Sequence, residues 1–523
     1  MTWPSRNRTD ISWRHHSSNP PTVIVFERDS PDPDAWRAGE ENSLSISGYN
    51  DASGLVALKR LGLVDDILAH AVSGLDGSGS FKIWGPDWRD HLSLRRRPVA
   101  GLSTSSIRIV RKGLRLALIR AVDSCENSSI RWGCRCSGVE KLQDGRLRMH
   151  IEHSRDGDAT HADCDLLIAA DGANSKLRAQ FRPQDGLNYV GAVLRGGLST
   201  FPAGLPNPID ESWGFMVSKT GVSCFFSPVD RNTVLWAVGH EEDEEVKELT
   251  WSSAPEERRA VIDRGAELGS LFHEPFPTIV QRTDPSTVMC INGRDKPPFR
   301  HDAIHDMPVV FIGDSNHALS PFAGFGANLA LHDAQGLAEQ LCKPFPTLVE
   351  AVEAYDRLSE PRAMRVWKGS RKNVRAGHST GLRYWLFLAI LWIGKWVGNL
   401  VGLLRRCVYK VVFIVVIVFI VLAIVGSGLL GAWVSNYPTY KTTTGGYSYY
   451  YSTGNDGLFY GAVVCFAIAG LAKIVAWILL IVWLVKRSRA RRNNVVTYVQ
   501  QPANYYAPPT QPQPAYSGAP VKA

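Results

Sequence analysis

The sequence predicts an α/β fold that carries an inserted, mainly β domain and ends in a hairpin of two transmembrane helices. Three features lead to this prediction. Apolar strands that end in acidic residues alternate with helical patterns in two parts of the chain. The stretch between those parts contains short strand-like runs rich in Val, Phe and Trp. Near the C-terminus, two apolar segments are each long enough to span a bilayer.

The boundaries of these units follow from the shifts in pattern. The α/β domain comprises residues 22–184 and 301–380, and the inserted sheet domain comprises residues 185–300. The C-terminal region divides into an interfacial amphipathic helix, two transmembrane helices and a disordered tail, at residues 384–404, 411–434, 458–485 and 494–523. A third membrane span is the alternative for the first of these four segments.

Single elements of the α/β domain are assigned from periodicity. Three apolar runs with an acid at or near their end are predicted as buried parallel strands, at residues 22–28, 165–172 and 308–314. Residues 130–152 alternate as strands do. Helical spacing of apolar residues predicts helices at residues 51–70 with a break at Gly62, 107–122, 254–272 and 327–341.

The basic residues support the membrane hairpin. The net charge is +8, but only residues 486–492 form a dense basic run, and this run directly follows the second apolar segment. A basic flank of a membrane span explains it better than a nucleic-acid patch, so no nucleic-acid partner is expected. Positive residues lie outside both spans, which predicts a multi-pass protein whose soluble domain and C-terminal tail face the cytosol.

The strongest chemical motif covers residues 313–328. A strand delivers Asp314 to its end, a loop containing Pro and Gly follows, and a helix begins near Ala327. Glycines allow the backbone to approach a ligand closely, and the free N–H groups of a helix N-terminus bind anions. By itself this pattern indicates a nucleotide or phosphate site, with Asp314 accepting a hydrogen bond from a sugar hydroxyl.

This segment resembles the second FAD fingerprint of the class A flavoprotein monooxygenases, which include salicylate, para-hydroxybenzoate and tetracycline-modifying enzymes. The resemblance implies a Rossmann-like FAD-binding domain in which Asp314 holds the ribityl or ribose part of FAD. It also implies that the loop wraps the isoalloxazine ring and the pyrophosphate. The residues expected to bind the cofactor here are Gly313, Asp314, Pro321, Gly324, Gly326, Ala327 and Asn328.

Further segments are similar to other motifs of the same family. Residues 171–178 resemble its Asp-Gly motif, which serves FAD and the nicotinamide cofactor; the alternative is an ordinary helix start capped by Asp171. The cofactor-binding residues implied by these weaker matches are Glu27 for the adenosine ribose, Arg37 near the nicotinamide path, Arg111 at the flavin, and Asp171, Gly172 and Arg178.

The sequence departs from the family before Glu27. The family opens with a Gly-rich dinucleotide loop, whereas residues 1–22 contain no glycine, so the Rossmann-like domain is expected to be N-terminally incomplete. Three interpretations are open: an incomplete gene model, a degraded enzyme, or weak FAD binding through the remaining motifs. The intact downstream motifs favour the first. A fused neighbouring gene would account for the C-terminal hairpin.

The resemblance implies an FAD-dependent monooxygenase that uses NAD(P)H and O2 to hydroxylate or epoxidise an aromatic or polycyclic small molecule, anchored in membrane lipid. No catalytic base stands out. Aromatic residues of the inserted sheet are candidates for the pocket wall, with ordinary domain core as the alternative: Trp213, Phe215, Phe225 and Trp236. The rival functions are a catalytically dead flavin-fold membrane interaction protein and an isoprenoid or lipid epoxidase.

No metal site is predicted. His305, His317 and His332 lack a carboxylate or Cys partner at ligand spacing. The nine cysteines show no paired spacing and are interpreted as reduced thiols of a cytosol-facing protein.

Overall fold

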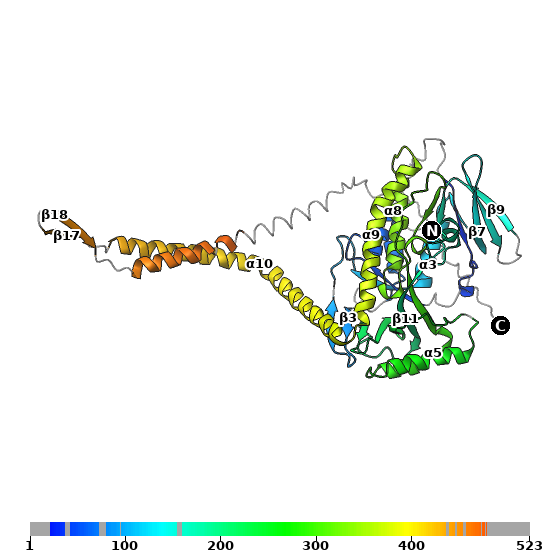
Figure 1. The fold of residues 1–523 in the computed structure, drawn as a ribbon, viewed down its shortest axis with the longest axis horizontal. Helices are drawn as coiled ribbons and strands as arrows, with labels where there is room; N and C mark the ends of the chain where they lie inside the picture. Colours follow the sequence, from blue (N-terminus) through cyan, green and yellow to red (C-terminus); the bar gives the residue numbers. More distant parts are fainter. Residues whose placement is uncertain are drawn as a thin grey trace, which may run out of the picture. The chain divides into compact units, whose positions relative to one another are not determined.

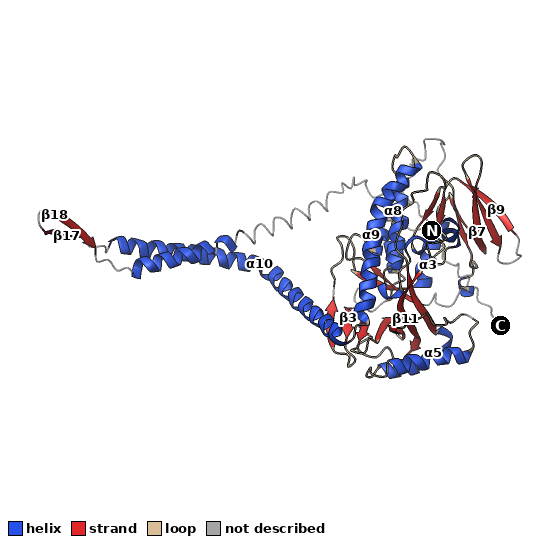
Figure 2. Ribbon diagram, in the orientation of Figure 1, coloured by secondary structure: helices blue, strands red, loops and turns tan. Residues whose placement is uncertain are grey.

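The computed structural model describes residues 21–36, 42–72, 80–94, 96–153, 159–250, 252–435, 439–444, 447–452, 457–471, 473–475 and 477. The chain divides into two compact units, Met1–Trp396 and Val397–Ala523. Figure 1 follows the chain by colour and Figure 2 by type of element. Arg37 and the tail 494–523 lie outside the described residues, as does most of the second half of 458–485.

The parallel strands of the first unit form two separate pairs. β1 (Val23–Glu27) pairs with β6 (Ser128–Trp132), and β10 (Leu167–Ala169) pairs with β16 (Val309–Phe311). All three predicted acid-terminated strands are therefore confirmed as parallel strands. The predicted burial of the first is wrong, because Ile24 in β1 is 39% exposed and no described strand other than β6 pairs with β1.

Helices cover these strands in the predicted order, with one correction. Gly62, at φ 74°, separates α1 (Gly54–Arg60) from α2 (Val64–Leu68), as expected. The predicted helix 107–122 begins later, because its first residues form β5 (Ser106–Val110), which pairs with β2 (Ser43–Ser47). The β-branched residues of β5 favour a strand. The helices that follow are α3 (Arg111–Asp123), α4 (Lys176–Phe181), α8 (Gly326–Leu341) and α9 (Leu348–Gly377).

Seven strands build the sheet of the inserted domain, in the order β15-β11-β14-β13-β12-β3-β4. Five of them come from the predicted segment: β11 (Asn188–Thr200), β12 (Ser212–Val217), β13 (Ser223–Pro228), β14 (Thr233–Glu241) and β15 (Met289–Asp295). The other two, β3 (Ser80–Trp84) and β4 (Asp90–Leu94), precede the boundary expected at residue 185, so that boundary misses part of the sheet. A separate three-stranded sheet contains β7 (Cys134–Lys141), β8 (Leu147–His153) and β9 (Ala159–Cys164).

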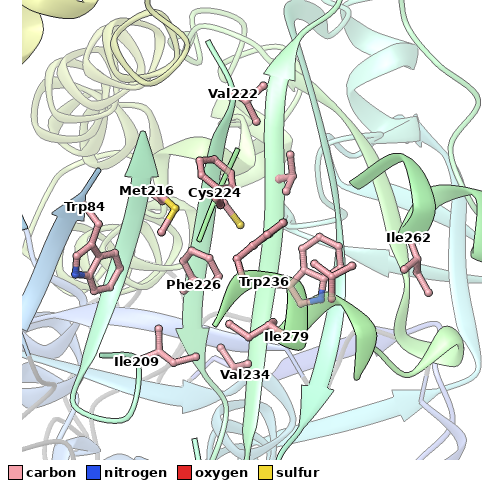
Figure 3. Packing of buried hydrophobic residues seen from close by; sticks show 14 of the residues in the cluster. Trp84, Ile209, Met216, Val222, Cys224, Phe226, Val234, Trp236, Ile262 and Ile279 are labelled. Carbon is pink, nitrogen blue, oxygen red and sulfur yellow. The ribbon is translucent and has the colours of Figure 1, made fainter. Parts of the chain in front are cut away.

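One face of the seven-stranded sheet is closed by two helices, α5 (Pro255–Leu268) and α6 (Phe276–Gln281). Figure 3 shows side chains of β12, β13 and β14 packed together there. Trp236 is fully buried in this core, with Nε1 donating to Thr283 Oγ1 at 2.9 Å. The expectation that Trp236 lines a pocket is therefore wrong. Burial of one such side chain contributes about 1.5–3 kcal/mol to folding.

A single helix, α10 (Gly381–Ser435), replaces the separate helices expected at residues 384–404 and 411–434. No proline or other strong helix breaker lies between the two expected segments. Two segments are long and apolar enough to cross a membrane, Ile417–Ser435 and Gly457–Val475. Between them, β17 (Thr439–Thr444) and β18 (Tyr447–Ser452) form an antiparallel hairpin that the sequence reasoning did not predict.

Candidate functional site

Asp314 lines a recess at the end of β16. It opens α7 (Asp314–His317) directly after Gly313, whose φ of 59° and close approach to Ala330 require glycine. The Asp314 side chain is exposed to solvent, yet desolvation by surrounding protein raises the pKa of its carboxyl, against the charges of His317 and Arg111. Exposure together with desolvation describes a carboxylate that points into a concave site.

The N-terminus of α8 opens into the same recess. The loop before it contains a short 3-10 turn (Pro321–Ala323) and Gly324 in the left-handed region, and no side chain caps the helix at Phe325. A Cβ atom at Gly326 would lie 3.7 Å from Asp314 Oδ1. Uncapped N–H groups beside an accessible carboxylate suit a ligand that carries both an anionic group and sugar hydroxyls. These residues fit the ribityl and phosphate parts of a dinucleotide.

A buried carboxylate holds the Gly313–Asp314 turn in place. Asp333 on α8 is fully buried and accepts hydrogen bonds from Gly313 N at 3.0 Å and from His317 Nε2 at 2.5 Å. It also accepts from Ser359 and Arg362 of α9. Burial opposes the charge of Asp333, but these partners hold the pKa of its carboxyl well below the usual range. The sequence reasoning missed this residue.

Two predicted cofactor ligands instead brace the protein. Asn328 Oδ1 accepts from Ser47 N at 2.8 Å and Gly54 N at 3.1 Å, and its amide nitrogen donates to Ser45 O. Arg178 is buried and donates to the backbone oxygens of Ser315, Ala173 and Asp185. Both side chains therefore hold the two motifs in place, and their polar groups are already engaged by protein.

The Asp-Gly turn remains open to solvent. Asp171 is exposed, and Gly172 has a φ of 84° that favours glycine. Ser175 rather than Asp171 is the N-cap of α4, since its side chain accepts from Arg178 N at 2.9 Å. Asp171 Oδ2 receives only a long 3.5 Å hydrogen bond from Leu177 N. The capping alternative therefore does not account for Asp171, and cofactor contact there stays a prediction.

Glu27 and Arg111 have different surroundings. Glu27 lies 3.4 Å from Arg115, and its other oxygen accepts from Asp29 N at 3.2 Å. Arg111 is exposed at the start of α3, and its charge lowers the pKa of Asp314, so the structure brings Arg111 to the recess. No described contact brings Glu27 to the same place.

The second face of the seven-stranded sheet carries a half-buried aromatic cluster. Phe81 lies 5.0 Å from Trp213, and Phe215 lies 4.9 Å from Phe225, between ring centroids. Phe322 of the loop before α8 contacts this face at Gly239, where an added Cβ would meet the Phe322 ring at 2.9 Å. The cluster and the recess therefore share one side of the sheet, as the sequence suggested for three of its four aromatic candidates.

The three histidines do not come together. Among the residues that the structure describes, no group of His, Cys, Asp and Glu could hold a metal ion. His317 pairs with Asp333, which raises its pKa against the effect of burial. His332 is buried with Nε2 bonded to Ser53 O at 3.1 Å. Burial first, and then Arg362 and Arg60, lower the pKa of His332 to about 4.

Acidification is expected to destabilise the fold through His332. Its folded-state pKa of about 4 lies below the ordinary 6.5, so the unfolded chain binds the proton first and stability falls between pH 6.5 and 4. The loss corresponds to roughly 3 kcal/mol. Thermal unfolding of the wild type and of His332→Gln, which keeps a donor for Ser53, checks this. The variant should lose less stability than the wild type, whereas the exposed-site control His305→Gln should follow the wild type.

The chain belongs to the FAD binding domain family, whose sequence profile matches residues 47–370, more than half of the chain. It is a member of the class A FAD-dependent monooxygenases. It is 40% identical to the monooxygenase cfoF of Aspergillus candidus over 69% of this chain and 86% of that protein.

More distant relatives match shorter stretches. The salicylate hydroxylase of Pseudomonas putida is 30% identical over 46% of this chain, and the 3-amino-4-hydroxybenzoate 2-monooxygenase of Streptomyces cremeus is 29% identical over 48%. The matches cover 56% and 58% of those two proteins. In structure, the chain resembles HpxO of Klebsiella pneumoniae complexed with FAD, with a TM-score of 0.55 and 18% identity. That match covers 73% of this chain and 97% of HpxO, and it supports the fold alone.

Proposed function

We propose that this chain is an FAD-dependent monooxygenase that uses NAD(P)H and O2 to hydroxylate an aromatic or polycyclic small molecule. The observation that carries the proposal is the recess at Asp314, where an accessible carboxylate meets the uncapped N-terminus of α8. The aromatic face beside it suits a flat, apolar substrate. The names of the relatives, which include hydroxylases of salicylate and of an aminohydroxybenzoate, support the same substrate class.

The residues of the site have separate roles in this proposal. FAD, when bound, supplies the redox chemistry that activates O2. Asp314 accepts hydrogen bonds from its sugar hydroxyls, and the α8 N-terminus stabilises negative charge on it. Asp333 and Asn328 keep these two groups in position. Phe81, Trp213, Phe215 and Phe225 exclude water from the substrate side.

The first test is the absorption spectrum of the detergent-purified chain after incubation with FAD and removal of the excess. The proposal expects flavin bands at about one FAD per chain, followed by NADPH or NADH oxidation that phenolic substrates stimulate. Flavin-loaded protein that never oxidises either nucleotide above background, with any phenolic or polycyclic compound, would contradict a monooxygenase.

A catalytically inactive flavin fold is the second candidate, and one observation favours it. The parallel strands are split into two pairs, Ile24 is exposed, and the Glu27 carboxylate is already paired with Arg115. A protein that remains colourless after incubation with FAD, although it is folded by circular dichroism, would support this candidate. Product analysis with phenolic and polyprenyl substrates separates aromatic hydroxylation from lipid epoxidation.

Membrane attachment is part of the proposal, and the first turns of α10 support it. At 100° per residue, the exposed apolar side chains of this segment fall within a single arc of the helix, while Tyr384 on the opposite side is buried. Such a stripe with three Trp residues suits the lipid interface. The stripe consists of Leu382, Trp385, Leu386, Ile390, Trp392, Ile393 and Trp396.

The membrane hairpin gives a testable topology. We expect alkaline carbonate to leave the full chain in the membrane pellet, because Ile417–Ser435 and Gly457–Val475 are mostly unburied apolar helices. A glycosylation acceptor introduced between residues 439 and 452 should be modified in microsomes, and one placed in the tail 494–523 should not. Release into the carbonate supernatant would contradict the hairpin, and modification of the tail would contradict its cytosolic orientation.

A further inference from the structure

Arg108 is a buried cation that faces the aromatic cluster. On β5, its neighbours Ile107 and Ile109 point into the core around α1 and α3. Because side chains alternate along a strand, Arg108 points the other way, toward the seven-stranded sheet. Its side chain is 3% exposed, and its guanidinium lies 4.9 Å from the centroid of the Trp213 ring.

Protein groups only partly satisfy this guanidinium. Nη2 donates to Ser43 Oγ at 2.9 Å and bonds to Ser227 Oγ. Within the described part of the chain, no carboxylate forms an ion pair with Arg108, and its Nε has no hydrogen-bond partner. Burial lowers the pKa of Arg108 to about 9, so the group is still charged at neutral pH. An uncompensated buried charge is costly for folding, which is why it is rare outside functional sites.

A second unpaired donor lies beside the first. Trp213 Nε1 is also buried without a hydrogen-bond partner, and its ring stacks with the Arg108 guanidinium. Buried donors in folded proteins are almost always paired, so two neighbouring unpaired donors of the same kind call for a shared acceptor. A cation and a neutral N–H together select an oxygen atom that carries negative charge.

The surroundings define what carries that oxygen. Phe225 lies on β13 between Ser223, which pairs with Gly239 beside Phe322, and Ser227, which bonds to Arg108. The four-residue separation along the strand corresponds to roughly 13 Å. That distance accommodates a flat aromatic ligand with one end at Arg108 and the other at the loop before α8.

We propose that Arg108 and Trp213 Nε1 form an anion subsite that binds the carboxylate or phenolate oxygen of an aromatic substrate. The subsite makes the protein prefer anionic aromatic compounds over neutral ones of the same shape. This inference rests on the proposed function, since it assigns the substrate class of the same pocket. It adds a specificity-determining residue that lies outside every motif recognised in the sequence.

The test is isothermal titration of the full-length, detergent-purified chain with salicylate and with its neutral amide, salicylamide. We expect salicylate to bind about 10- to 100-fold more tightly, as for a charged hydrogen bond. Arg108→Gln should remove this preference, and Trp213→Phe should reduce it several-fold while it keeps the aromatic wall. Arg89→Gln is the matched control, because Arg89 is an exposed Arg beside β4 of the same sheet. A phenol series with different pKa values distinguishes phenolate from carboxylate recognition.

The outcomes separate the subsite from the proposed function. Equal affinity for salicylate and salicylamide, or binding of neither, overturns the subsite even if the protein is yellow with FAD. Retained preference in a colourless chain supports the subsite while the monooxygenase proposal fails. If Arg108→Gln is unfolded by circular dichroism, Trp213→Phe and Arg108→Lys carry the test. An unchanged salicylate preference in both variants overturns the subsite.

Discussion

Replacing Asp314 with Ala is expected to weaken FAD binding by about 10- to 100-fold, the effect of losing a hydrogen bond to a charged group. Asp314 is the accessible carboxylate of the recess and lies beside the α8 N-terminus. Asp314→Asn keeps the shape and one acceptor, so its loss should be smaller. Titration of flavin fluorescence in the purified chain measures both affinities.

The same substitution should also raise the thermal stability of the chain without FAD. Desolvation raises the pKa of Asp314 in the folded state, so the folded chain disfavours the ionised form. A raised pKa means that stability declines as the pH rises through this range, and Asp314→Asn removes that decline. Such opposite effects on binding and on stability are typical of a functional residue rather than a structural one.

Asp302→Ala is the matched control for these measurements, since Asp302 is an exposed aspartate on the segment that leads into the strand before Asp314. It should leave both FAD affinity and melting temperature unchanged. If Asp314→Ala binds FAD as tightly as the wild type, the recess is not the flavin site. If both variants lose binding equally, the effect is not specific to the recess.

The sequence was sufficient for those parts of the site that are local in the chain. The Gly313–Asp314 turn and the helix start at Gly326 lie within one short segment, and their residue types state their backbone requirements directly. The split of the parallel strands was only partly accessible. The missing Gly-rich loop was visible, but the exposure of Ile24 depends on which strands pair with β1.

Strand register explains why one aromatic prediction failed. Phe215 lies opposite Phe225, and Phe225 lies opposite Ala237, so these residues share a face. Trp236 is one position away and must point to the other face. Composition treats Trp213 and Trp236 alike, and only the pairing between strands distinguishes a pocket wall from the core.

Long-range partners were out of reach for the same reason. Asp333 on α8 binds groups from the Gly313 turn and from α9. A charged residue on the buried side of an otherwise apolar helix was a usable signal, because an aspartate is fully buried only when it is paired. The sequence could have indicated that Asp333 has partners without identifying them.

Asp333→Asn is expected to destabilise the chain by about 3–5 kcal/mol, the range measured when one member of a buried ion pair is removed. The variant leaves protonated His317 and Arg362 near an amide whose nitrogen now faces donors. Thermal unfolding of the full chain in detergent measures the loss. Glu339→Gln on the exposed side of the same helix is the matched control and should change stability by less than about 0.5 kcal/mol.

The pH dependence of this difference tests its cause. The folded-state pKa of Asp333 is depressed, so its contribution is fully present above the ordinary value of 3.8 and is lost only as the pH falls further toward the folded value. The gap between wild type and Asp333→Asn should therefore stay constant from pH 5 to 7 and narrow only in stronger acid. Because Asp333 also binds Gly313 N, the variant should bind FAD more weakly at every pH at which it is folded. A variant that loses stability but keeps full FAD affinity would show that the turn holds Asp314 in position without this carboxylate.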